Sequence, residues 1–233
     1  MDNISRTPDC VGIIMDGNRR WARAKGLPVF EGHRQGYQKL KDVSDWAKEA
    51  GIGTLIVYAF SEENWKRTVE ELGFMMDLIR WIIKDQMNEA QKRNVKISFI
   101  GAIEKFSPDI AEGFAKVTEE TKHNTGLHLV IAVSYGGRQE IVRAAAELAK
   151  VVAQQGISTI STEEFEKHLY TSGIPDPDMI IRTSGEMRIS GFLPWQSVYS
   201  ELFFTPTLWP DFSREEFTKM LNEFSLRQRR LGK

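Results

Sequence analysis

The fold of this chain is decided by the stretch Val11-Gly12-Ile13-Ile14-Met15-Asp16-Gly17-Asn18-Arg19-Arg20-Trp21. A continuous apolar run, which is typical of a buried strand, stops abruptly at Asp16. Gly17 and Asn18 follow, and both residue types favour turns. We therefore predict a strand, then a turn, then the start of a helix. Ligands of open α/β sheets bind beyond the carboxyl ends of strands, which is where Asp16 would lie.

The residues after this strand suit a metal ion bound together with a phosphate. Asp16 supplies a carboxylate, Gly17 and Asn18 can expose backbone N–H groups, and Arg19 and Arg20 supply positive charge. The same aspartate could instead only cap the helix that follows. These residues alone do not decide between the two interpretations.

Composition indicates one soluble globular domain, and we assign residues 1–233 to it. Apolar residues make up 41% of the chain and charged residues 27%, while the net charge is −1, so no global basic field favours nucleic acid. The one cysteine, Cys10, cannot form an internal disulfide, which favours a reducing compartment. The first eight residues are polar, so we expect no signal peptide, and no apolar run is long enough to span a bilayer.

Strand patterns alternate with helix patterns along the chain. This alternation predicts an α/β fold with a mainly parallel central sheet and helices on both faces. The predicted strands are Val11–Ile14, Thr54–Phe60, Val95–Gly101, Leu127–Val133, Met179–Ile181 and Glu201–Thr205. The predicted helices are Gly32–Ala50, Val69–Lys92, Pro108–Lys122, a helix from about Gly137 to Gln155, a short one from Ser161 to Tyr170, and one capped by Ser213.

The predicted helix Val69–Lys92 is apolar on nearly all sides. Such a helix is either covered on most faces, in a core or a subunit interface, or lines an apolar cavity. Both explanations fit the sequence.

Polar clusters follow three of the predicted strands, at Asp16–Trp21, Ser61–Arg67 and Arg182–Ser190. In the third cluster Arg182 and Arg188, with Ser184 and Ser190 nearby, could clamp a diphosphate, because guanidinium groups bind phosphate oxygens in bidentate fashion. A single surface arginine is usually only a solvated charge. Arginines at the ends of several strands are harder to explain in that way.

The sequence lacks the signatures of several other phosphate and metal sites. It has no phosphate-loop motif and no dinucleotide-binding glycine motif. Its single cysteine and four scattered histidines do not have the spacing of a zinc site. A hard cation such as Mg²⁺, bound by one or two carboxylates and by substrate phosphates, fits better. Asp16 is the first candidate ligand and Glu201 the second.

Several blocks together resemble the cis-prenyltransferases, the family that includes undecaprenyl diphosphate synthase. The resemblance covers nearly the whole chain in the expected order. The blocks are Met15–Ala22, Gly32-His33, Tyr58–Ser61 with Glu63-Asn64-Trp65, Arg182–Ser190, Phe192–Gln196, Tyr199–Leu202 and Leu208–Phe212. The trans-type prenyl synthases use aspartate-rich segments, and this chain has no Asp-Asp pair.

The resemblance implies a magnesium-dependent transferase that adds isopentenyl diphosphate to an allylic diphosphate, with farnesyl diphosphate expected, and forms cis double bonds. The product would be a polyprenyl diphosphate such as undecaprenyl diphosphate, the lipid carrier of cell-wall glycan synthesis, with shorter products as the alternative. The resemblance also implies an apolar tunnel for the product and a homodimer. We expect a cytoplasmic enzyme that contacts the membrane loosely when it releases its product.

The resemblance also assigns roles to individual residues. Asp16 would bind Mg²⁺ and the departing diphosphate, Glu201 would be the second Mg²⁺ carboxylate, reaching across a dimer, and Asn64 would assist proton removal. A positioned water or the departing diphosphate could equally take that proton. The allylic diphosphate would be bound by Gly17, Asn18, Arg19, Arg20, Trp21 and His33. Isopentenyl diphosphate would be bound by Arg182, Arg188 and Ser190. The reacting carbons would lie under Ser61, Asn64, Trp65 and Arg67. Further candidates for substrate binding are Glu62, Glu63 and Ile189.

This chain departs from the family pattern at two positions. Val29 stands where the family commonly has a basic residue, and Arg19 stands where many bacterial members have glycine. We hypothesise that Arg19 partly replaces the missing charge. Two other functions compete with the synthase: a non-catalytic partner subunit on the same fold, and a phosphatase that uses Asp16 as its nucleophile.

Overall fold

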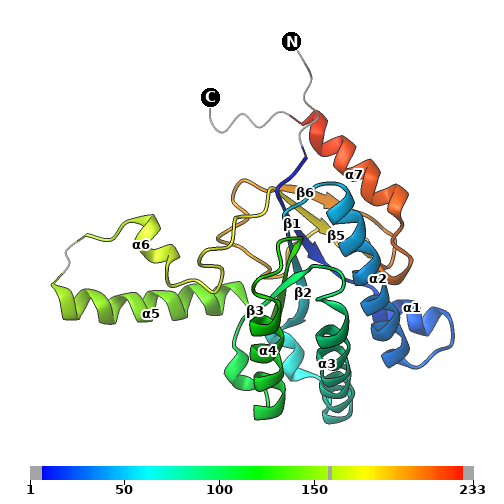
Figure 1. Ribbon diagram of the computed structural model, residues 1–233, viewed down its shortest axis with the longest axis horizontal. Helices are drawn as coiled ribbons and strands as arrows, with labels where there is room; N and C mark the ends of the chain where they lie inside the picture. Colours follow the sequence, from blue (N-terminus) through cyan, green and yellow to red (C-terminus); the bar gives the residue numbers. More distant parts are fainter. Residues whose placement is uncertain (1–6, 157–158, 228–233) are drawn as a thin grey trace.

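The computed structural model describes residues 7–156 and 159–227. Its centre is a six-stranded sheet in the order β3-β4-β2-β1-β5-β6, in which every pairing is parallel (Figure 1). The strands are β1 Cys10–Ile14, β2 Thr54–Ser61, β3 Lys96–Ile100, β4 His128–Tyr135, β5 Met179–Arg182 and β6 Glu201–Phe204. All six predicted strands and the parallel sheet are confirmed, with ends that shift by one or two residues.

The predicted helices are also present, with small differences at their ends. The helices are α1 Asn18–Ala24, α2 Val29–Glu49, α3 Val69–Glu89, α4 Pro108–Thr121, α5 Gly137–Gln155, α6 Thr162–Glu166 and α7 Arg214–Leu226. Short 3₁₀ helices are η1 Glu62–Lys66, η2 Ile103–Lys105 and η3 Trp209–Asp211. Helix α2 begins earlier than predicted, directly after Pro28, because proline's fixed φ suits a helix start. Ser213 caps α7 in a reciprocal capping box with Glu216.

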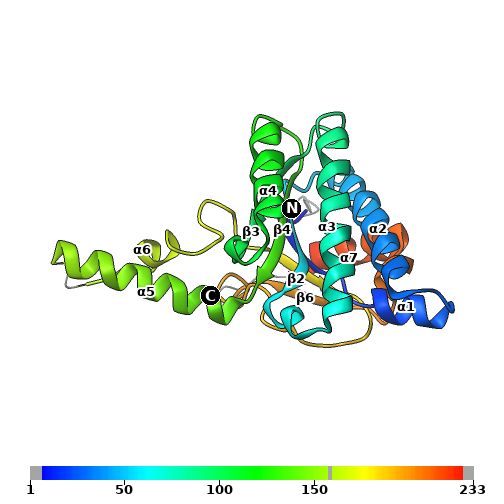
Figure 2. The same cartoon turned by 90° about the horizontal axis from the view of Figure 1, so that it is seen from below.

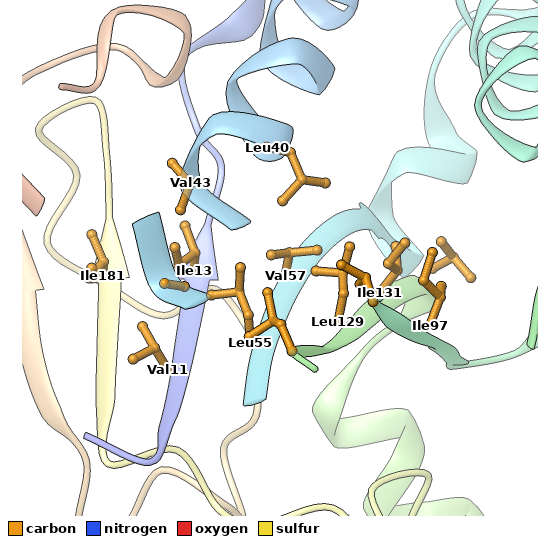
Figure 3. Packing of buried hydrophobic residues seen from close by; sticks show 14 of the residues in the cluster. Val11, Ile13, Leu40, Val43, Leu55, Val57, Ile97, Leu129, Ile131 and Ile181 are labelled. Carbon is orange, nitrogen blue, oxygen red and sulfur yellow. The ribbon is translucent and has the colours of Figure 1, made fainter. Parts of the chain in front are cut away.

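The helices cover one face of the sheet. Figure 2 shows α2, α3 and α4 side by side on that face, and α7 packs into the same apolar core through Phe217 and Phe224. In Figure 3, Leu40 and Val43 of α2 lie over side chains of the sheet that include Ile13 and Val57. This core holds the strands rigidly and therefore fixes where their carboxyl ends lie.

The other face differs from the prediction of helices on both faces. Its buried cluster contains Ile14, Ile56 and Val130 from strands, and these pack against Phe192 and Leu193 of an irregular segment. Helix α5 instead projects away from the body of the molecule, with α6 beside it (Figures 1 and 2). Periodicity correctly located α5, but periodicity carries no information about which surface a helix covers.

The sheet order brings the predicted polar clusters together. β1 lies between β2 and β5, so the three clusters follow three adjacent parallel strands and meet at one edge of the sheet. From β1 the chain first adds strands on one side, β2 to β4, and then adds β5 and β6 on the other side. Open α/β sheets bind ligands at such a topological switch point. Within residues 7–156 and 159–227, no helix combines the length and apolar character that a membrane span requires.

Candidate active site

The turn after β1 depends on Gly17. Its φ of 115° is in the left-handed region, and a Cβ there would lie 3.0 Å from the Cα of Leu208. The turn is fixed from the other side by the carbonyl of Asp16, which accepts hydrogen bonds from Thr183 Oγ1 at 2.6 Å and from the N–H of Trp209 at 3.0 Å. The Asp16 side chain is thereby held at the carboxyl edge of the sheet.

The carboxylate of Asp16 is ion-paired and does not cap the helix. Its Oδ2 lies 2.9 Å from Nη2 of Arg182, and its Oδ1 lies 3.4 Å from Nη2 of Arg20. The N-cap of α1 is Gly17, so the capping interpretation is wrong. Burial would raise the pKa of Asp16, but hydrogen bonds from Arg182 and Ser184 and the charge of Arg20 hold the pKa below its usual value. Asp16 is therefore ionised at neutral pH.

Arg182 connects two of the clusters. Only 5% of this residue is exposed, and its guanidinium bonds Asp16 through Nη2 and Ser190 Oγ through Nη1, the latter at 2.8 Å. The same Nη1 donates to the carbonyl of Arg188. Arg182 thus orients the segment 188–190 toward the turn after β1. Its Nε is buried without a partner, which leaves one donor unsatisfied beside the site.

These groups surround a cavity of about 520 Å³. Eleven of the predicted site residues line it: Asp16, Gly17, Asn18, Arg19, Arg20, His33, Ser61, Asn64, Arg67, Arg182 and Ser190. Five arginines line the cavity, and Asp16 is the one carboxylate among its lining residues. Such a surface favours a ligand with several negative charges.

Arginine and histidine side chains form the side of the cavity that faces α2 and α3. Arg19 is ion-paired with Glu71 of α3, with Nη2 and Oε1 2.9 Å apart. Arg67 donates to the sulfur of Met75. Burial, together with the charges of Arg67 and Arg19, lowers the pKa of His33 to about 4, so this imidazole is neutral near pH 7.

The predicted residues Glu62 and Trp65 hold η1 in place instead of lining the cavity. Trp65 Nε1 donates to Ser134 Oγ at 2.8 Å, and that hydroxyl donates to Glu62 Oε2 at 3.1 Å. Ser134 is the second-last residue of β4 and has a φ of 46°, an unusual conformation for a residue with a side chain. Through this network β4 positions Asn64, whose Oδ1 also accepts the N–H of Ser61 at 3.2 Å.

Other predicted site residues lie outside the cavity lining. Trp21 donates its indole N–H to Asp211 at 2.8 Å and so joins α1 to η3. Arg188 is exposed and pairs with Glu186. Glu63 and Ile189 are likewise not among the lining residues.

Glu201 lies at the opposite end of the sheet from Asp16. The strand register aligns Val11 with Met179 and Met179 with Glu201, whereas Asp16 comes after the last residue of β1. Glu201 pairs there with Arg227 at 2.8 Å. Within one chain these two carboxylates cannot share a metal ion. Among the residues that the structure describes, no group of three or more His, Cys, Asp or Glu side chains could hold a metal.

Comparison with known proteins identifies the family. A family model described as "Putative undecaprenyl diphosphate synthase" matches residues 14–232. The isoprenyl transferase of Thermotoga maritima is 43% identical over 97% of this chain and 97% of its own. The chain belongs to the undecaprenyl diphosphate synthase family of isoprenyl transferases. The resemblance seen in the sequence is thereby confirmed.

Two solved structures of diphosphate synthases resemble this chain over nearly its whole length. Lavandulyl diphosphate synthase from Lavandula x intermedia, in complex with dimethylallyl diphosphate, matches with a TM-score of 0.92 and 33% identity over 97% of this chain and 99% of that chain. A "probable undecaprenyl diphosphate synthase" from Campylobacter jejuni matches with a TM-score of 0.82 and 31% identity over 98% of this chain and 100% of that chain.

Six further residues of this isoprenyl transferase line the cavity and were not predicted as site residues: Ile14, Met15, Arg23, Tyr58, Ala59 and Met75. Arg23 lies one helical turn after Arg19 and Arg20, so helical spacing could have identified it. Tyr58 lies within the continuous apolar run of β2, where it looked like part of a buried strand. Met75 looked like a packing residue of α3, and no local signal distinguishes the two roles.

The contact between α1 and α2 yields a prediction about this isoprenyl transferase. Replacing Gly32 with alanine should lower the free energy of unfolding by about 1–3 kcal/mol, because the added Cβ would lie 2.1 Å from the carbonyl oxygen of Asn18. The matched control is Gly73→Ala in α3, where no atom lies within 4 Å of the added Cβ. The midpoint temperature of thermal unfolding should fall for Gly32→Ala. It should stay unchanged or rise for Gly73→Ala. A Gly32→Ala protein as stable as wild type would contradict this packing.

Proposed function

We propose that this isoprenyl transferase joins isopentenyl diphosphate to an allylic diphosphate, with a cis double bond in each added unit. The observation that carries this proposal is the cavity lined by five arginines and the single carboxylate of Asp16. Two diphosphates carry several negative charges, and guanidinium groups bind their oxygens in bidentate fashion. The family membership supports the same chemistry.

The residues of the site suit a Mg²⁺ ion. Asp16 offers an ionised hard oxygen ligand, and an ion bound by one carboxylate would take its other ligands from water and the substrate diphosphate. When bound there, Mg²⁺ would neutralise charge on the departing diphosphate. We propose Asp16 as its protein ligand.

The two sides of the cavity suit two different substrates. The turn Gly17–Arg20 and His33 would hold the allylic diphosphate, and Arg182 with Ser190 would hold isopentenyl diphosphate. Arg182 lies between them through its bond to Asp16. Ser61 and Asn64, which η1 brings to the cavity, would lie over the reacting carbons.

The chain's own residues can assist each bond change. As the allylic C–O bond breaks, the arginines stabilise the negative charge that develops on the departing diphosphate. The allylic carbon then bonds the terminal carbon of isopentenyl diphosphate, and a proton leaves C2 to restore a double bond. Asn64 is a neutral amide and thus a weak base, so the departing diphosphate or a water would take that proton. Asn64 would orient the group that accepts the proton.

The substrate range is tested by incubating the enzyme with labelled isopentenyl diphosphate and dimethylallyl, geranyl or farnesyl diphosphate, each with Mg²⁺ or with a chelator. We expect Mg²⁺-dependent extension, with farnesyl diphosphate as the starter and undecaprenyl diphosphate as the product. Mass analysis of the product would reveal shorter chains. Shorter chains are the alternative because this structure also resembles a synthase that was solved with dimethylallyl diphosphate bound. Release of free phosphate without extension would indicate a phosphatase, and no turnover would indicate a partner subunit.

We also propose a homodimer that meets the membrane only when it releases product. The large apolar side chains of Val142 on the projecting α5, and of Val198 and Tyr199, are exposed. Exposed apolar side chains mark interfaces when they form a continuous patch. A second subunit is also required if Glu201 is to reach a metal bound at Asp16. Light scattering of the purified enzyme would show whether it is a dimer.

The pairing of Arg19 with Glu71 allows a test of charge compensation. Arg19→Gly should raise the KM for dimethylallyl diphosphate about tenfold, since a cation that lines the cavity is lost. Adding Val29→Arg should recover most of this loss, because Val29 lies on the adjoining surface beside Arg67 and His33. If the double variant is no better than Arg19→Gly alone, the compensation hypothesis fails.

A further inference from the structure

Ser184, which lies two residues after the end of β5, has an unusual backbone conformation. Its φ of 78° is in the left-handed region, which glycine enters freely and residues with a side chain rarely enter. Only 6% of Ser184 is exposed, so its polar groups must be bonded within the protein. Residues in such conformations persist where the surrounding structure holds them, and they are concentrated at functional sites.

The loop that follows β6 holds Ser184 in this conformation. The N–H of Ser184 donates to the carbonyl of Thr207 at 2.7 Å. The N–H of Gly185 donates to the carbonyl of Thr205 at 2.8 Å. Both threonine hydroxyls donate in turn to Oε1 of Glu216, which belongs to the capping box of α7. The start of α7 thus fixes the loop, and the loop fixes the backbone of Ser184.

In this conformation Ser184 presents two oxygen atoms to Arg20. Its carbonyl accepts a hydrogen bond from Nη1 of Arg20 at 3.1 Å, and its hydroxyl oxygen accepts one from Nη2. The same hydroxyl donates to the carboxylate of Asp16, whose Oδ1 lies 3.4 Å from Nη2 of Arg20. One serine therefore holds both terminal nitrogens of the guanidinium and joins Arg20 to Asp16.

The guanidinium of Arg20 depends on these contacts for its position. The side chain of Arg20 is 48% exposed, whereas that of Arg182, on the other side of Asp16, is 6% exposed. Within residues 7–156 and 159–227, the hydrogen-bond acceptors of this guanidinium are the two oxygens of Ser184, and its ion-pair partner is Asp16. An exposed arginine samples many rotamers unless it is bonded to a rigid group. The turn at Ser184 is such a group.

We propose that Ser184 is a positioning residue that holds the guanidinium of Arg20 in place for the diphosphate of the allylic substrate. Ser184 is not among the residues that line the cavity, so it would act through Arg20, which does line it. The inference rests on the proposed function, in which Arg20 belongs to the turn that holds this diphosphate. Guanidinium groups bind phosphate with a defined geometry, so a displaced Arg20 would lose affinity although it stays charged. Glycine would relax the backbone at this position but has no hydroxyl.

The test compares Ser184→Gly with Ser184→Ala, because both lack the hydroxyl and only glycine relaxes the backbone. Each variant should raise the KM for dimethylallyl or farnesyl diphosphate about tenfold and change the KM for isopentenyl diphosphate less than about twofold. Ser184→Gly should unfold at a temperature equal to or above that of Ser184→Ala. If the affinity were lost only because the fold is destabilised, the loss would be larger in Ser184→Ala.

The matched control is Ser44→Ala. Ser44 is also a buried serine, 3% exposed, and its hydroxyl donates to the carbonyl of Leu40 at 2.7 Å, but it is not among the residues that line the cavity. This variant should keep both KM values. A second comparison measures equilibrium binding of the unreactive thiolo analogue of farnesyl diphosphate to Arg20→Ala. Adding Ser184→Ala to this variant should weaken binding little further, because the group that Ser184 positions is already absent.

The outcomes separate the positioning role from the function. If Ser184→Ala leaves the allylic KM unchanged, raises both KM values equally, or weakens binding as much without Arg20 as with it, the positioning role is overturned and the proposed function stands. If wild type extends neither allylic substrate, both are overturned. Should Ser184→Ala fail to fold, Ser184→Gly carries the same test with its relaxed backbone.

Discussion

Replacing Asp16 with asparagine should lower kcat by about three orders of magnitude, which is the scale of loss when a preorganised charge-stabilising group is removed. The substitution keeps the size of the side chain but removes the charge that pairs with Arg182 and Arg20. It also removes the proposed ligand of Mg²⁺. Steady-state kinetics with isopentenyl diphosphate and an allylic diphosphate measure the effect.

The matched control for Asp16→Asn is Asp109→Asn. Asp109 also pairs with an arginine, Arg80, at 2.7 Å, but that pair is exposed and joins α3 to α4 outside the cavity. The control should retain wild-type kcat, since an exposed ion pair contributes little. Both variants should keep the circular dichroism spectrum of the fold. A folded Asp16→Asn enzyme with near wild-type kcat would exclude Asp16 from the chemistry.

The elements of this fold could be predicted from the sequence because their signals are local. The apolar run before Asp16 and the capping residue Ser213 each depend on neighbours within a few positions. The same is true of the three polar clusters, which directly follow strands. What local patterns indicate is the type of element and the residues at its end.

The arrangement of those elements required the structure. The bond from Arg182 to Asp16 joins residues 166 positions apart, and it forms because β5 pairs with β1. No periodicity predicts that pairing. The same limit explains Ser134, which positions η1 from the end of β4 but is an ordinary strand residue in the sequence.

The sequence also could not separate residues that line the cavity from those that support it. Trp21, Glu62 and Trp65 lie within the same motifs as the lining residues, but their polar atoms bond other parts of the protein. The orientation of each side chain on a turn or a short helix decides whether that side chain faces the cavity. A motif gives the set of residues, and only coordinates give the direction of each side chain.

Replacing Arg182 with lysine should lower kcat/KM for isopentenyl diphosphate at least about 100-fold, which corresponds to about 2.7 kcal/mol. The guanidinium reaches Asp16 with one nitrogen and both Ser190 and the Arg188 carbonyl with the other. A lysine ammonium is a point charge and cannot reproduce this geometry. The effect should be larger when isopentenyl diphosphate is varied than when the allylic substrate is varied. Arg80→Lys, in the exposed pair with Asp109, is the control and should change neither parameter.

The two variants affect one ion pair, and this makes a stronger test than either alone. If Asp16 and Arg182 act together, the double variant Asp16→Asn, Arg182→Lys should lose much less activity than the product of the two single losses, because each single change already breaks the pair. The exposed pair Asp109–Arg80 should show no such coupling. Strict multiplication of the two losses would mean that Asp16 and Arg182 serve separate steps, and that the 2.9 Å contact between them only orders the unliganded site.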